Sequence, residues 1–208
     1  MRSKTTMLSI FLLFASLFST AQDSLNFISG ADASFMKKKA LTVVKSFNEL
    51  LNILAGKEQN FIDEMTNNSY NTNNKSRIFL DSSIRINEDI DPSSTTNIAV
   101  LITVSRYLNT FYLEYEKSDD PSSVEMNILK VSLPKKAFDA DTAYPFVKVF
   151  FNSHFHNKNK HQPNDEYRTT NRYADVRMIK DKEAWLGYIQ RIGFFVSEDT
   201  LQNFTTDD

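Results

Sequence analysis

The chain has 208 residues and contains no cysteine, which excludes disulfides, thiolate nucleophiles, sulfur-ligated metal sites and lipid attachment at a cysteine behind a signal peptide. Its 24 basic and 26 acidic residues are interspersed and give a net charge of −2. This balance lacks the basic surface typical of proteins that bind nucleic acid or anionic lipid. We therefore expect neither as a partner.

The first predicted element is a secretory signal peptide over residues 1–21. Arg2 and Lys4 precede an apolar run from Met7 to Phe18, and the small residues of Ser19-Thr20-Ala21 end it. The run is shorter than the roughly 20 residues that cross a bilayer, and its end suits signal peptidase. The sequence therefore predicts cleavage after Ala21 and export to the periplasm or the medium. No later stretch is long and apolar enough for a membrane anchor, so we expect the mature chain to be soluble.

The mature chain has the length of one domain. Residues 22–34 are predicted as a polar leader and residues 35–208 as the domain. A helix opens the domain and ends at Gly56, because apolar residues recur three and four positions apart. These residues are Met36, Ala40, Val43, Val44, Phe47, Leu50, Leu51 and Leu54. Lys37-Lys38-Lys39, the only basic run, is interpreted as a solvated helix face, with a phosphate or headgroup contact as the alternative.

Short elements are expected next. A second helix is predicted over Glu58 to Thr66, and the asparagine-rich stretch from Asn67 to Asn74 is predicted as a loop. Residues 77–80 and 83–86 have the composition of two small strands, or of one strand and a bulge.

A third helix is predicted before the sheet. Asp91 and Pro92 have the residue types of a helix start. The apolar period from Ile98 to Tyr112 then favours a helix, with a buried strand as the alternative.

Beyond Leu113 the apolar pattern changes to period two, which is typical of an antiparallel meander. A tight charged hairpin is expected over Lys180 to Glu183. Polar turns are expected over residues 118–123, 134–141 and 157–165. The predicted strands are Val124 to Leu133, Tyr144 to Phe155, Tyr167 to Lys180, Trp185 to Phe195 and, if the preceding helix stops early, Phe111 to Glu116.

This order of elements resembles the nuclear-transport-factor-2-like superfamily, also called cystatin-like or SnoaL-like. The resemblance is carried by Lys38 to Leu54, Phe61-Ile62-Asp63-Glu64-Met65, Arg77-Ile78-Phe79-Leu80 and the closing hairpin Arg172 to Phe195. It implies an α+β fold in which two or three N-terminal helices pack in a strongly bent, cone-like antiparallel sheet. In this superfamily the cone serves catalysis on small molecules in some members, and only binding or dimerisation in others. Enzymatic members carry an Asp–His or Asp–Arg–Tyr set, to which no positions of this sequence can be matched.

Tyr173, Asp175 and Arg177 are the candidate binding residues. Strand alternation would direct all three to one face, where they could form an acid–base or anion-binding set in the cone. The favoured alternative is a solvent-exposed face that carries cross-strand ion pairs. Asp63 and Glu64 on the second helix are interpreted as part of an amphipathic surface.

The three histidines lie close together in the sequence. His154 and His156 would share one strand face, with His161, Asp165 and Glu166 following, and such a group could bind a metal. Because the segment is polar and contains two lysines, an exposed hairpin is the favoured interpretation, and we predict no metal and no cofactor.

We therefore expect an exported module that binds an unidentified small ligand or a protein partner, with homodimerisation through the open sheet. No residue is predicted to be catalytic. The alternative is a small-molecule enzyme of the isomerase, dehydratase or hydrolase type that uses an acid–base pair in the cone. A buried ionisable group with a polar partner at the base of the cone would favour this alternative.

Overall fold

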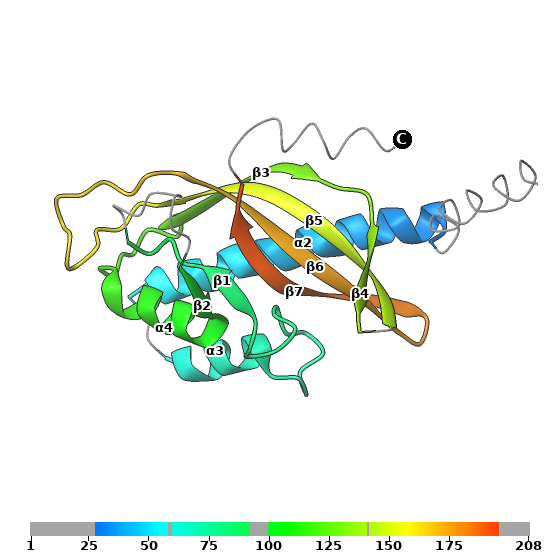
Figure 1. Cartoon of the computed structure of the whole chain (residues 1–208). Helices are drawn as coiled ribbons and strands as arrows, with labels where there is room; N and C mark the ends of the chain where they lie inside the picture. Colours follow the sequence, from blue (N-terminus) through cyan, green and yellow to red (C-terminus); the bar gives the residue numbers. More distant parts are fainter. Residues whose placement is uncertain (1–27, 58–59, 92–99, 141, 196–208) are drawn as a thin grey trace, which may run out of the picture.

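The computed structural model describes residues 28–57, 60–91, 100–140 and 142–195. In this part of the chain, three helices and seven strands form an α+β fold with one open sheet, and the long helix α2 lies behind the sheet in Figure 1. The predicted α+β class is confirmed. The predicted signal peptide lies outside the described residues, and none of the described helices is long and apolar enough to span a membrane.

Helix α2 spans Gly30–Ala55, and its buried stripe contains the eight predicted apolar positions together with Ala55. The helix begins earlier than predicted, so the last five residues of the expected polar leader are helical. The reason is a local N-cap, because the Ser29 hydroxyl accepts a hydrogen bond from the Asp32 N–H at 3.1 Å. At the other end, the N–H of Gly56 bonds to the carbonyl of Ile53 at 3.1 Å.

The sheet is mixed rather than wholly antiparallel as predicted. Strands β1 and β7 pair in parallel, whereas all other neighbours are antiparallel. Strand β4 lies off the main path and continues the edge formed by β3, because both pair with the longer β5. The spatial order is β2 (Leu101–Thr103), β1 (Arg85–Asn87), β7 (Ala184–Phe194), β6 (Thr170–Asp181), β5 (Thr142–Phe155) and β3 (Val124–Val131), with β4 (Lys135–Asp139) beside β5.

The two faces of the sheet differ in chemistry. Alternate residues of β6, including Ala174 and Val176, belong to the same buried core as helix α2. The helix packs closely on β7, since a Cβ added at Gly187 would lie 3.3 Å from Cγ of Lys39. By alternation, Tyr173 and Asp175 lie on the opposite face.

Helices α3 (Ile62–Tyr70) and α4 (Val104–Glu114) complete the described helices. Helix α3 begins and ends about one turn later than predicted, so it includes the first four residues of the expected asparagine-rich loop. Its N-cap, Phe61, has the left-handed φ of 68° and bears no capping side chain. Helix α4 is amphipathic and buries Val104, Tyr107, Leu108 and Phe111.

Lys117 links the C-terminal ends of α2 and α4. Its ammonium donates to the carbonyls of Leu54 at 2.7 Å and Tyr112 at 2.6 Å. Such carbonyls have no partner within their own helices, and a cation near them is favourable. Burial, followed by the charge of Lys160, lowers the pKa of Lys117 to about 8.

Several predicted strands differ from the structure. Residues 77–80 contribute only a single bridge, between Phe79 and Ile189, and residues 111–114 belong to α4 rather than to a strand. The predicted turn after residue 134 contains strand β4, which has mostly polar residues. Within the predicted helix from Ile98, residues 101–103 form β2 and the helix starts at Val104. The predicted helix start at Pro92 lies outside the described residues.

Candidate functional site

The predicted binding residues share one face of β6, the face opposite α2, but they form two separate groups. Asp175 is paired with its cross-strand neighbour Lys148, whose Nζ lies 2.5 Å from Asp175 Oδ1. The same ammonium lies 3.6 Å from the centre of the Tyr173 ring. Arg177 instead approaches Asp139 at 3.4 Å and the Tyr144 ring at 3.9 Å.

Burial shapes the electrostatics of this face. It lowers the pKa of Lys148, an effect that the charge of Asp175 opposes, and it raises the pKa of Tyr173. Asp175 pairs with Lys148 across neighbouring strands, as the favoured alternative expected. Both side chains are only 12–13% exposed, however, so the face around this pair is not the solvent-exposed surface of that interpretation.

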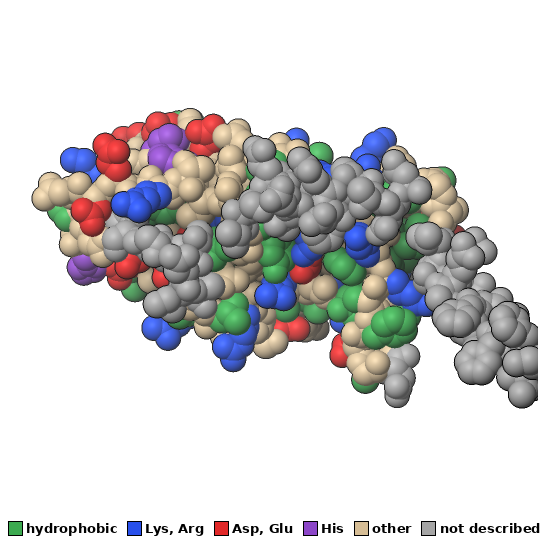
Figure 2. All heavy atoms as spheres, turned by 45° about the horizontal axis from the view of Figure 1, so that its top comes forward, with side chains coloured by type: hydrophobic (Ala, Val, Ile, Leu, Met, Phe, Trp, Pro, Cys, Tyr) green, Lys and Arg blue, Asp and Glu red, His purple; other side chains and the backbone are tan. Residues whose placement is uncertain are grey.

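The histidines lie at the end of the molecule that holds the β5–β6 connection, where acidic and histidine side chains gather in Figure 2. The rings of His154 and His156 are 4.6 Å apart, and His156 Nε2 lies 3.3 Å from Glu125. His161 pairs separately with Glu114 at 2.8 Å. Burial and the neighbouring His156 lower the pKa of His154. The described residues contain no group of three or more histidine or carboxylate side chains placed to hold a metal.

A fully buried ion pair joins β6 to the segment after β1. The side chains of Arg172 and Asp89 are 0% exposed, and Arg172 Nη1 lies 2.5 Å from Asp89 Oδ2. Tyr107 and Tyr167 donate their hydroxyl protons to Asp89 at 2.7 and 2.8 Å. Arg172 Nη2 donates to the carbonyl of Asn87 at 2.5 Å. We call Asp89, Tyr107, Tyr167 and Arg172 the buried tetrad.

The tetrad is held in one protonation state. Burial, together with the charge of Asp89, raises the pKa of Tyr107 and Tyr167 well above the usual value. Burial acts against the Arg172 cation, but the interactions with Asp89, Tyr107 and Tyr167 together outweigh it and raise the pKa of the guanidinium. The hydroxyls therefore remain neutral donors, and the two full charges neutralise each other. Such an arrangement fixes the relative positions of β6, α4 and the segment after β1.

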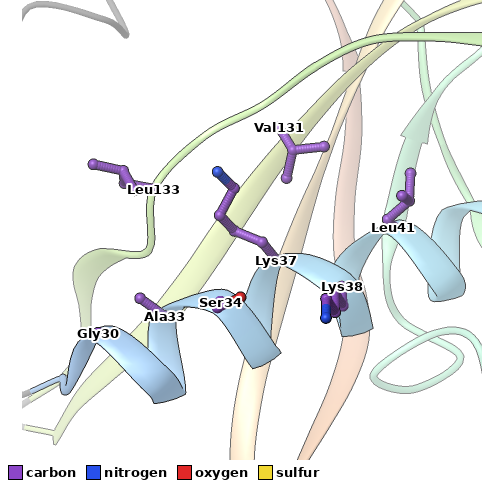
Figure 3. A pocket seen from close by; sticks show the side chains of 8 residues that line it. All are labelled: Gly30, Ala33, Ser34, Lys37, Lys38, Leu41, Val131 and Leu133. Carbon is purple, nitrogen blue, oxygen red and sulfur yellow. The ribbon is translucent and has the colours of Figure 1, made fainter.

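An open groove runs along one side of α2, beside the chain that connects β3 to β4 (Figure 3). It has a volume of about 530 Å³. Leu41 lies on the helix side, whereas Val131 and Leu133 lie on the strand side. The remaining lining residues are Gly30, Ala33, Ser34, Lys37 and Lys38.

The groove lies where one edge strand of the sheet, β3, ends and the next, β4, has not yet begun. Strand β3 ends at Val131, and the buried Ser132 then continues the pairing, since its hydroxyl accepts a hydrogen bond from the Lys148 N–H at 2.9 Å. Leu133 is half exposed, and β4 begins only at Lys135. The helix flank opposite this connection is thus left partly open.

The charged residues that line the groove, among those that the structure describes, are Lys37 and Lys38. Lys37 projects from α2 toward the segment that carries Val131 and Leu133, and Lys38 is seen nearly end-on (Figure 3). Within the described part of the chain, neither ammonium has a carboxylate partner. The nearby Asp32 interacts with β7 instead, where it accepts a hydrogen bond from Trp185 Nε1 at 2.9 Å.

Sequence reasoning missed both the buried tetrad and the groove. A signal for Arg172 existed, because alternate residues of a strand point to the same face and Arg172 alternates with Ala174, Val176 and Met178. An arginine in such an apolar row indicates a buried partner. Asp89 has no such signal, since it stands within an acidic stretch. Lys37 and Lys38 could not be distinguished from Lys39 without the position of the β3–β4 connection.

In comparisons with known proteins, no family model, no curated protein and no solved structure matches the chain.

Proposed function

We propose that the protein is an exported binding module of the nuclear-transport-factor-2-like superfamily and that the groove beside α2 is its ligand site. The pattern of residues 1–21 supports export. The packing of α2 on one face of an open sheet supports a cone-like member of the superfamily. The observation that carries the proposal is the groove, whose volume of about 530 Å³ lies within the range of about 300–1,000 Å³ that small-molecule sites occupy.

The buried tetrad is a buried ionisable group with polar partners, the feature expected of the enzymatic alternative. Its inaccessibility nevertheless favours binding over catalysis. An acid–base catalyst needs a titratable group that reaches the substrate. The carboxylate and guanidinium of the buried tetrad are 0% exposed and are engaged with each other. Among the described residues, the groove itself is lined by no carboxylate and no histidine. The enzymatic alternative would require the tetrad to open.

The test is to block the groove without disturbing the core. Ser34 lines the groove and is exposed, so Ser34→Trp should fill it, whereas Thr42→Trp places the same side chain at an exposed position of α2 outside the groove. We expect native mass spectrometry of the wild-type protein to show a co-purified small molecule, which the Ser34→Trp variant loses and the Thr42→Trp variant retains. Retention by Ser34→Trp would show that the groove is not the site.

Self-association is a second candidate function, because β3 forms one edge of the sheet and Leu129 is 45% exposed there. Unpaired edge strands can pair with another copy of the chain. The bulge between Ile128 and Lys130 interrupts that edge and acts against extended pairing. Sedimentation velocity tests this candidate, since Leu129→Lys should convert a dimer to a monomer, and a monomeric wild-type protein would exclude it.

A further inference from the structure

We infer that the groove binds a small amphipathic anion, a single apolar chain that ends in a carboxylate or sulfate. This inference rests on the proposed function and adds the chemical class of the ligand. The described residues of the groove combine aliphatic side chains with two lysines, and these two properties select opposite ends of the same molecule.

The headgroup preference follows from the unneutralised charge. Lys37 and Lys38 are consecutive in α2 and both line the groove. In the described residues no acid pairs with them, and the nearest acid in the sequence, Asp32, is held by Trp185 and Ser29. An anion in the groove would therefore gain charge-assisted hydrogen bonds without displacing an existing ion pair.

The preference for an apolar chain follows from the remaining walls. Leu41, Val131 and Leu133 present aliphatic carbon from both sides of the groove. Covering such surface stabilises a complex by about 25 cal/mol per Å² of apolar area removed from water. A compact inorganic anion would leave these walls exposed, whereas an alkyl chain would cover them. The stem of Lys37 adds further methylene groups while its ammonium remains available.

The experiment compares four probes that share an eight-carbon chain and differ in the headgroup: octanoate, octyl sulfate, octyl glucoside and octyltrimethylammonium. Binding is measured by isothermal titration calorimetry at low salt and below the micellar range. We expect the two anions to bind, octyl glucoside to bind at least tenfold more weakly, and the cation not to bind. The affinity for the anions should fall as sodium chloride is added, because exposed charges are screened.

Three variants locate the interaction. Lys37→Met with Lys38→Met should weaken octyl sulfate binding about tenfold, as expected for loss of hydrogen bonds to a charged group, whereas Lys45→Met, an exposed lysine of α2 outside the groove, should leave it unchanged. Leu133→Ala should weaken the binding of the anions while their salt dependence is retained. Circular dichroism should show unchanged folding, because Leu133 is 49% exposed.

The outcomes separate this inference from the proposed function. If octyl glucoside binds as tightly as octyl sulfate and Ser34→Trp abolishes both, the groove is a ligand site but the anionic class is wrong. If phosphatidylglycerol vesicles bind and free octyl sulfate does not, the occupant is a membrane surface and the inference is overturned. If no probe binds and no co-purified molecule depends on the groove, both the inference and the proposed function fail.

Discussion

The ion pair between Arg172 and Asp89 should be the most sensitive electrostatic interaction of the fold. Both side chains are 0% exposed, and the carboxylate is also bonded to the hydroxyls of Tyr107 and Tyr167. Arg172→Met leaves the Asp89 charge buried without a counterion. Asp89→Asn leaves the opposite charge unpaired but keeps an oxygen that can accept from Tyr107.

The expected magnitude follows from complete burial. Removing one partner of a buried pair costs about 3–5 kcal/mol, because the other charge is left in a low-dielectric environment. The whole free energy of unfolding of a domain is about 5–15 kcal/mol. Arg172→Met should therefore remove a large fraction of the stability. Adding Asp89→Asn to Arg172→Met should restore part of the loss, since the double variant carries neither charge.

Urea denaturation of the four proteins of this cycle, followed by far-ultraviolet circular dichroism, measures these changes. Lys75→Met is the matched control, because Lys75 pairs with Asp181 of the same strand but its side chain is 72% exposed, so the urea midpoint should not change. A double variant that loses as much stability as the two single variants together would refute the reasoning, because the two charges would then not interact.

Three further predictions concern packing and protonation. Gly193→Ala would place a Cβ 2.7 Å from the ring of Tyr173 and should cost about 1–3 kcal/mol in urea denaturation, a loss that should disappear in a Tyr173→Ala background; an equal loss there would contradict the contact. Because burial raises the pKa of Tyr107 and Tyr167, their contribution to stability is complete below the unfolded-state pKa near about 10 and is lost as the pH rises above it. Tyr167→Phe should therefore show a shallower alkaline decline, and an unchanged slope would argue against a raised pKa. The ¹³Cε resonance of Lys117 should titrate near pH 8, and a midpoint above about 10 would show that its ammonium is not desolvated.

The parts of the fold that sequence predicted best are those in which one periodicity dominates. Helix α2 buries all eight predicted apolar positions, because a stripe of that length can face a sheet in only one way. Strand β4 could not be recognised, since Lys135 to Asp139 are mostly polar and are strand only because they pair with the start of β5. Its partner, the start of β5, follows directly in the sequence, but the residues of β4 have no alternating apolar pattern that would indicate a strand.

The candidate site depended even more on tertiary structure. Strand alternation correctly placed Tyr173, Asp175 and Arg177 on one face, but periodicity alone does not say which face meets the helix. The apolar row that contains Ala174 and Val176 packs against α2, so the predicted set lies on the other side of the sheet. The groove was not predictable, because it depends on where the chain leaves β3 relative to a helix about ninety residues earlier in the sequence.

Ser132 fixes the register of the sheet edge, whereas the next residue, Leu133, contributes to the shape of the groove. Its N–H and its hydroxyl both bond to the backbone of Lys148 at 2.9 Å, so the sheet edge is anchored just before the chain turns away. Leu133, the next residue, is half exposed and lines the groove. Substitutions or insertions at Leu133 and Pro134 can therefore accumulate at little cost to folding. Such changes would alter one wall of the groove while the pairing of β3 with β5 stays as it is.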